Sequence, residues 1–205
     1  MTTETKVKEY PILFTGEMVR AILDGRKTQT RRVVKSQPNG SIDHCYRCPD
    51  GRFNWCFASG VGAGDPWPCP YGVPGNNLWV REGHGFCPKT YKPGGVIYRS
   101  DGEDDHVMTY EWRPSIHMFR KDSRITLEVT EVRVERVQKI RADSSPFGHD
   151  DVGEEGCPLR RGCFHYDDRA MTWFRELWDS INAKRGFSWE SNPWVWIVSF
   201  KKIKP

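Results

Sequence analysis

The 205-residue sequence predicts an α+β fold: a single domain, residues 1–205, built on a small, mostly antiparallel β-barrel with flanking helices. Three observations support this class. Strand and helix patterns do not alternate repeatedly, which disfavours a doubly wound parallel sheet. The long strand pattern of residues 124–137 slips in phase at residues 130–131, as a bulged or sharply bent barrel strand does. Residues 36–76 hold so many glycines and prolines that we expect a long irregular insertion there.

The amino-terminal part predicts a strand, a short helix and a second strand. Residues 10–14 form an apolar run suited to a buried strand. Thr15 is a candidate N-cap for the helix that follows, and Gly25 is a suitable residue for ending it. Residues 28–34 are β-branched or long and polar, and they predict a strand. The apolar face of the helix is made of Met18, Val19, Ile22 and Leu23.

Five further elements are predicted beyond the insertion. They are strands at residues 78–82, 96–99 and 124–137, a helix at 171–181 and a terminal strand at 194–200. Leu78 and Val80 share one face of the first of these strands. Glu82 continues that face, so we expect its carboxylate at the edge of the core.

The composition excludes two classes of protein. No apolar run approaches the roughly eighteen residues needed to cross a bilayer, and residues 1–9 are polar, without the apolar centre of a secretion signal. Seven cysteines are an odd number, and without secretion a disulfide framework is not expected. We therefore expect a cytoplasmic protein with no membrane partner.

The charge is concentrated in one segment. The sequence has 31 basic and 27 acidic residues, a net charge of +4. Residues 16–35 alone hold six basic and two acidic residues, so their surplus equals that of the whole chain. A local basic patch on a nearly neutral chain favours an anionic partner such as nucleic acid, and a solvated charged face is the alternative.

The segment Gly-Arg-Lys-Thr-Gln-Thr-Arg-Arg at residues 25–32 directly follows the predicted helix. A short helix that ends in Gly-Arg-Lys-Thr-x-Thr resembles the opening motif of the ASCH domain family, which belongs to the PUA-like superfamily. Tyr-Gly-x-Pro-Gly at 71–75, Leu-Trp-Val-Arg-Glu at 78–82 and the bent and terminal strands agree with it. Trp-Arg-Pro-Ser-Ile-His-Met at 112–118, with the large insertion, resembles ASCH proteins encoded by phages and prophages. The resemblance covers about residues 10–35, 71–140 and 170–203.

The resemblance implies a PUA-like barrel that associates with RNA. It also implies similarity to small bacterial amidohydrolases that act on acetylcytidine and need no cofactor. In those enzymes a lysine, a threonine three residues later and a downstream glutamate are taken as catalytic. These roles carry over onto Lys27, Thr30 and Glu155, with Glu154 and Glu82 as alternatives for the glutamate.

The chemistry of these residue types is coherent on its own. A threonine hydroxyl needs a neighbouring base to act as a nucleophile. Burial beside other cations lowers the pKa of a lysine, so Lys27 can take the proton of Thr30, and a carboxylic acid can protonate the leaving amine. Residues three apart in a flat strand point to opposite faces. Lys27 is therefore expected in the turn before the strand, or with its long stem curled round.

Basic residues that can hold phosphate flank this motif and recur downstream. The candidates are Arg26, Arg31, Arg32, Arg113, His117 and Arg120. The last three lie at intervals of four and three, so a helical turn would place them on one side as an anion-binding patch; capping or salt-bridge roles are the alternative. Two other functions therefore stay open: a non-catalytic RNA-binding module, and a ribonuclease that uses the same basic cleft.

The insertion contains a further pattern. Cys45-x-x-Cys48, followed by Cys56 and Cys69, can supply four zinc ligands that would hold the insertion in place, and free thiols are the alternative.

Aromatic residues are frequent, at 13% of the sequence, and some fall in predicted loops. Trp55, Trp67 and Trp112 are candidates for stacking on an unpaired base. Packing of the insertion on the barrel is the alternative for each of them. Most of the tryptophans at 173, 178, 194 and 196 are expected in the core.

Overall fold

The computed structural model of this chain describes residues 7–38, 42–60, 62–86, 95–102, 111–139 and 165–203. The chain divides into two compact units, each assembled from separate stretches of sequence. The first unit comprises Met1–Lys27, Pro70–Thr130 and Phe200–Pro205. The second unit comprises Thr28–Cys69 and Glu131–Ser199.

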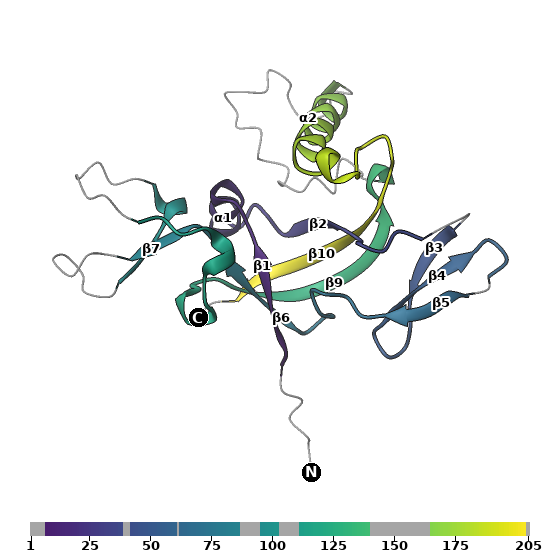
Figure 1. The fold of residues 1–205 in the computed structure, drawn as a ribbon, viewed down its shortest axis with the longest axis horizontal. Helices are drawn as coiled ribbons and strands as arrows, with labels where there is room; N and C mark the ends of the chain where they lie inside the picture. The colour runs from purple at the N-terminus through teal and green to yellow at the C-terminus, as the bar shows by residue number, and fades with distance from the viewer. Residues whose placement is uncertain are drawn as a thin grey trace, which may run out of the picture. The chain divides into compact units, whose positions relative to one another are not determined.

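Figure 1 labels both helices and most of the strands of the two units. The first unit contains α1 (Gly16–Leu23), β1 (Glu9–Leu13), β6 (Asn77–Arg81), β7 (His84–Phe86) and β8 (Val96–Tyr98). The second contains α2 (His165–Asn182), β2 (Gln29–Val33), β3 (Ile42–Arg47), β4 (Phe53–Phe57) and β5 (Gly62–Trp67). The strands β9 (Thr126–Arg136) and β10 (Trp194–Ile203) each include residues of both units. Short 3₁₀ helices lie at η1 (Arg99–Asp101), η2 (Ser115–His117), η3 (Arg120–Asp122), η4 (Val137–Lys139) and η6 (Ala183–Arg185).

The described strands form three sheets, and most of their pairs are antiparallel. A five-stranded sheet has the order β1-β6-β9-β10-β2, and the others are β3-β4-β5 and β7-β8. β1 and β6 run parallel, whereas β2 pairs antiparallel with β10 and β6 with β9. The prediction of a mostly antiparallel α+β fold is thus confirmed. A closed barrel is not seen among the described strands, because β1 and β2 each have a neighbour on one side and form the edges of an open sheet.

The helix α1 has the start and stop that its sequence predicts. The Thr15 hydroxyl oxygen accepts the Met18 N–H at 3.5 Å. Glu17 lies in the first turn, where its negative charge interacts favourably with the positive end of the helix dipole. Gly25 follows the helix with φ of +78°, a left-handed conformation that glycine adopts without strain. These local signals end the helix at Leu23, four residues before Lys27.

The phase slip predicted in the long strand is present in β9. Leu127 and Val129 are buried on the amino-terminal side of the slip, and Val132 and Val134 on the carboxyl-terminal side. Residues 130–131 between them are both exposed. The extra residue therefore moves the buried face from odd to even positions, as in a β-bulge.

The insertion is not irregular, which corrects the expectation for residues 36–76. Residues 42–47, 53–57 and 62–67 form the antiparallel sheet β3-β4-β5. Many of the chain-breaking residues lie in its turns, where the Gly51 N–H donates to the Cys48 carbonyl and the Gly60 N–H to the Phe57 carbonyl, both at 2.9 Å. Aromatic packing then anchors the sheet within the second unit: the Phe53 ring meets Trp196 edge-on at 4.8 Å.

Each unit has its own buried apolar side chains. In the first unit the most deeply buried include Ile12, Leu78, Val80, Met118 and Leu127. In the second, α2 packs on the sheet through Val137, Phe174, Trp178, Val195 and Ile197. The predicted core positions of Trp178, Trp194 and Trp196 are confirmed, whereas Trp173 is 49% exposed. Among the described helices, none has an apolar stretch of the length needed to span a membrane.

Candidate functional site

Lys27 lies in the turn between α1 and β2, outside the strand, as the spacing argument predicts. Its backbone N–H donates to the Ala21 carbonyl at 3.0 Å, which binds the turn to the helix. The Lys202 ammonium donates to the Leu23 carbonyl at 2.9 Å and satisfies one carbonyl at the helix end. The Lys27 residue is 3% exposed. Such burial is rare for lysine because its ammonium requires polar surroundings.

Thr30 and Arg31 are consecutive residues of β2, so their side chains point to opposite faces of the sheet. Thr30 is paired with Val198 of β10 and is 4% exposed. Arg31 is paired with Ile197, a member of the cluster on which α2 packs, and is 9% exposed. Its guanidinium lies 5.9 Å from the centre of the Phe174 ring. The two residues therefore serve different faces of one strand.

Burial lowers the pKa of Arg31 to about 10, and the positive charge of Arg133 acts in the same direction, whereas the Glu135 carboxylate opposes it. The guanidinium still carries its charge at neutral pH. Arg133 is bound to Glu131 at 2.6 Å and to Glu135 at 2.7 Å. An anion that reached Arg31 would offset part of the cost of burying this charge.

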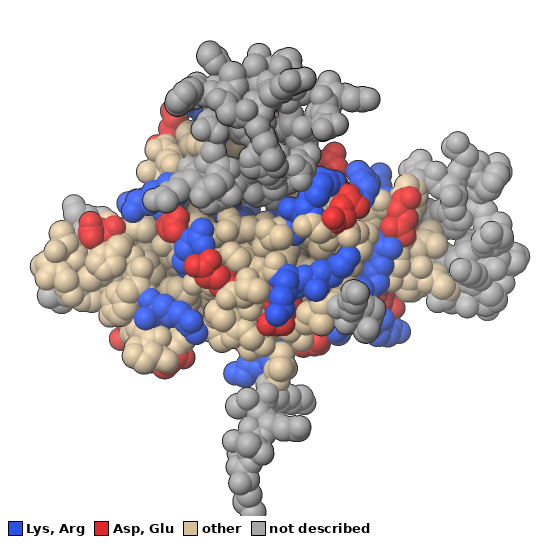
Figure 2. Space-filling view, turned by 180° about the vertical axis from the view of Figure 1, so that it is seen from behind, with Lys and Arg blue, Asp and Glu red and all other residues tan. Residues whose placement is uncertain are grey.

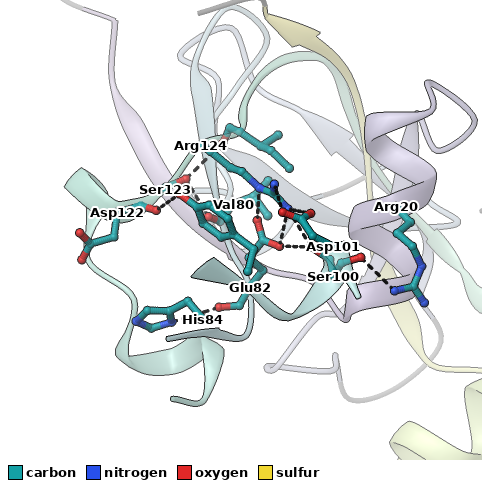
Figure 3. Close-up of polar contacts among 11 residues, drawn as sticks. Arg20, Val80, Glu82, His84, Ser100, Asp101, Asp122, Ser123 and Arg124 are labelled. Atoms are coloured by element: carbon teal, nitrogen blue, oxygen red, sulfur yellow. Dashed lines mark hydrogen bonds and ion pairs between the residues drawn. The ribbon is translucent and has the colours of Figure 1, made fainter. Parts of the chain in front are cut away.

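Glu82 follows β6 and is 1% exposed, as expected for a carboxylate at the edge of the core. Arg124 donates from Nε to Glu82 Oε1 at 3.0 Å and from Nη2 to Oε2 at 3.2 Å. The Ser100 hydroxyl donates to the same Oε2 and accepts from Arg124 Nη2 at 2.8 Å. Figure 3 shows how these three side chains converge. Because both carboxylate oxygens are engaged, the arrangement favours a structural ion pair over a proton donor to a substrate.

This ion pair extends to the helix that precedes Lys27. Arg124 also binds Asp101 at 2.6 and 2.7 Å, and its guanidinium lies 3.9 Å from the centre of the Tyr98 ring. From α1, Arg20 Nη1 donates to the Ser100 carbonyl at 3.2 Å (Figure 3). The network thus ties α1 to the segment that follows β8 within the first unit.

The six predicted phosphate-binding residues are divided between the units. Arg31 and Arg32 belong to the second unit, and Arg26, Arg113, His117 and Arg120 to the first. Two of them are held by acidic neighbours: Arg26 lies 2.8 Å from Asp24, and Arg120 lies 2.8 Å from Glu9, whose pKa is lowered mainly by the hydrogen bond from Arg120. On the face drawn in Figure 2, lysine and arginine side chains alternate with acidic ones.

The segment from Arg113 to Arg120 is not one helix. Arg113 forms an isolated bridge with His84, η2 covers only three residues, and η3 begins at Arg120 after an extended Phe119. Helical spacing therefore does not place Arg113, His117 and Arg120 on one side. The bond from Arg120 to Glu9 matches the alternative salt-bridge role.

The loop tryptophans chiefly pack against other aromatic residues. Trp55 is 8% exposed, and its ring lies 4.6 Å from that of Trp67 and 5.2 Å from that of Trp194. Trp112 is partly buried. For Trp55 and Trp67, packing of the insertion is favoured over base stacking.

The cysteine pattern does not fit a single four-thiol zinc site. In the β3–β4 ladder Cys45 is paired with Trp55, whereas Cys56 is paired with His44, one residue earlier in β3. Paired residues share a face, so Cys45 and Cys56 point to opposite sides of the sheet. Among the residues that the structure describes, no three His, Cys, Asp or Glu side chains lie together in a group able to hold a metal.

The zinc content of the purified protein tests whether these four cysteines form a metal site. Burial, with a contribution from Cys48, raises the pKa of the Cys45 thiol to about 12, so it stays protonated at pH 8. We expect protein purified without chelators to contain no zinc, and Cys45 to react with iodoacetamide far more slowly when folded than when unfolded. About one zinc per chain that disappears in Cys48→Ser would contradict this arrangement and restore the four-cysteine site.

The carboxylate assigned to proton donation, Glu155 or Glu154, lies outside the described residues. Sequence reasoning missed Ser100 and Arg124, which enclose Glu82. They lie 18 and 42 positions from it, so no spacing pattern connects them.

A scan of protein-family models, a search of curated proteins and a search of solved structures find no match to this chain.

Proposed function

We propose that this protein binds RNA or a modified nucleoside, and that residues 25–32 deacylate an N-acylated cytosine nucleoside. The observation that carries the proposal is the burial of Lys27, Thr30 and Arg31, which are 3%, 4% and 9% exposed. Lysine and arginine are seldom fully buried unless they are paired, so two of them buried within five residues make an unusual segment. The resemblance to the ASCH opening motif gives this burial a chemical meaning, and the proposal includes the PUA-like fold of that family.

The roles follow the chemistry of the groups. Lys27 as base takes the proton of the Thr30 hydroxyl, and the threonine oxygen attacks the acyl carbon. The carbon–nitrogen bond then breaks, and the amine receives a proton from the carboxylic acid of Glu155, or of Glu154. Water cleaves the resulting ester, which releases the acyl group as a free carboxylic acid and restores the Thr30 hydroxyl. The proton that Lys27 took then returns to the glutamate, which closes the cycle. Arg31 lies on the opposite face of β2 from Thr30, so its proposed role is to hold an RNA phosphate away from the reacting acyl group.

Two other functions use the same residues. In a non-catalytic RNA-binding module the cations only grip phosphate, which the exposed Arg113 and His117 favour. In a ribonuclease Lys27 acts as an acid or stabilises charge. The products distinguish the three functions. An amidohydrolase releases deacylated cytidine, a binding module leaves its ligand intact, and a ribonuclease cleaves RNA.

RNA binding is tested by its dependence on salt. Contacts to about three phosphates of a single strand give a slope of about −2 in log K against log salt. Raising the salt fourfold should therefore weaken binding of a labelled single-stranded RNA by about 20-fold, measured by fluorescence anisotropy. No binding at low salt, or an affinity that salt leaves unchanged, would contradict the RNA-binding part of the proposal.

A further inference from the structure

The segment between β8 and β9 exposes two large apolar side chains. Phe119 is 65% exposed and Ile116 is 56% exposed, more than any other large apolar residue in the described part of the chain. Phenylalanine belongs to the residues most often buried in folded proteins. Together, two such side chains three residues apart expose apolar surface on which a ligand can pack.

The backbone that carries these side chains is held in place. Met118 lies between them in the chain and is fully buried. Arg81 donates from Nε to the Met118 carbonyl at 3.1 Å and from Nη2 to the Ile116 carbonyl. On the far side of Phe119, the Asp122 carbonyl accepts the Tyr98 hydroxyl at 2.9 Å. Phe119 is therefore presented from a fixed segment, which lowers the ordering cost of binding.

The charge of the same segment suits an anionic partner. The cations Arg113, Arg120 and Lys121 are all exposed, and so is His117, whose ring can take part in hydrogen bonds. Arg120 donates two hydrogen bonds to Glu9, but both side chains are partly exposed, at 43% and 38%, so a phosphate has access to Arg120 and can compete with Glu9 for it. An aromatic ring set among cations is the combination that binds single-stranded nucleic acid, because bases stack and phosphates pair with the cations.

We infer that Phe119 is a stacking platform for an unpaired RNA base, with Arg120 and His117 contacting the adjacent phosphates. This inference rests on the proposed function and names the part of the surface that receives the single strand. Stacking needs a flat ring with a π-face, whereas an apolar protein or lipid contact needs only apolar surface. The two kinds of occupant are therefore separable by side-chain shape.

The test is the affinity of a labelled single-stranded RNA for the full chain and four variants. Phe119→Ala should weaken binding between about 5-fold and about 150-fold, the range of lost base stacking. Phe119→Trp should bind at least as tightly as the original protein, and Phe119→Leu as weakly as Phe119→Ala. Ile116→Ala is the matched control and should change the affinity less than about 2-fold, since it removes no ring.

Each other outcome has a distinct meaning. If the original protein binds RNA and Phe119→Ala binds equally well, the stacking platform is wrong while the proposed RNA binding stands. If Phe119→Leu binds the RNA as tightly as the original protein does, the contact does not depend on a flat ring, and the inference is overturned. If the original protein binds no RNA, the RNA-binding proposal itself fails. Thermal unfolding of each variant controls for folding.

Discussion

Replacing Arg124 with alanine is expected to destabilise the first unit by about 3–5 kcal/mol, the usual cost of leaving a buried charge without its partner. The reason is the position of Glu82, which is 1% exposed and bonded by Arg124 to both carboxylate oxygens. Without Arg124, the hydrogen bond from the Ser100 hydroxyl is the one that remains on that carboxylate within the described part of the chain. Urea unfolding measures the effect as a lower midpoint with an unchanged slope.

The matched control is Arg120→Ala, which also removes an arginine bound to a glutamate. The Arg120–Glu9 pair is also bidentate but is far more exposed than Glu82, so its loss should cost only about 1 kcal/mol. If Arg124→Ala yields no folded protein, the double variant Glu82→Leu with Arg124→Met should restore folding, because an apolar pair of similar volume avoids the uncompensated charge. If Arg124→Ala and Arg120→Ala lower the free energy of unfolding equally, the buried Glu82–Arg124 pair is no more important for stability than a surface pair.

Local signals predicted much of the fold from sequence. The Thr15 cap, the Gly25 stop and the phase slip in β9 each depend on neighbouring residues, and all three are present. The sheet β3-β4-β5 was missed because its strands are short and separated by many turn residues. Its order depends on rings distant in sequence, such as Phe53 on Trp196. No local pattern reports such a contact.

The candidate site was predictable only in part. The burial of Glu82 and the position of Lys27 outside the strand follow from side-chain alternation and helix stop signals. The partners of Glu82 do not, since a buried ion pair is made by the tertiary fold. The exposure of Phe119 could not be predicted from the sequence, because the tertiary fold decides which side chains cover an aromatic ring.

Loss of the Lys27 amine is expected to have the largest effect on activity. A positioned general base contributes about 10²- to 10⁴-fold to a rate, so Lys27→Met should reduce deacylation by at least about 100-fold. Methionine keeps much of the buried stem that lysine provides, and thermal unfolding checks the fold. The exposed Lys35, just after β2, provides the control: Lys35→Met should leave the rate unchanged.

The hydroxyl of Thr30 offers an independent pair of variants. Thr30→Val keeps the shape of the side chain without its oxygen and should abolish deacylation. Thr30→Ser keeps the oxygen and should retain activity. If Thr30→Val and Thr30→Ser both deacylate at the rate of the original protein, the Thr30 oxygen is not the nucleophile.

The most direct measurement is the release of cytidine from acetylcytidine by the purified protein, followed by chromatography beside an incubation with total RNA. The account predicts that the original protein and Lys35→Met release cytidine, whereas Lys27→Met does not. Cleaved RNA with intact acetylcytidine would indicate a ribonuclease. If the original protein and Lys27→Met are equally inert on acetylcytidine and on RNA, the catalytic role of the buried motif is contradicted.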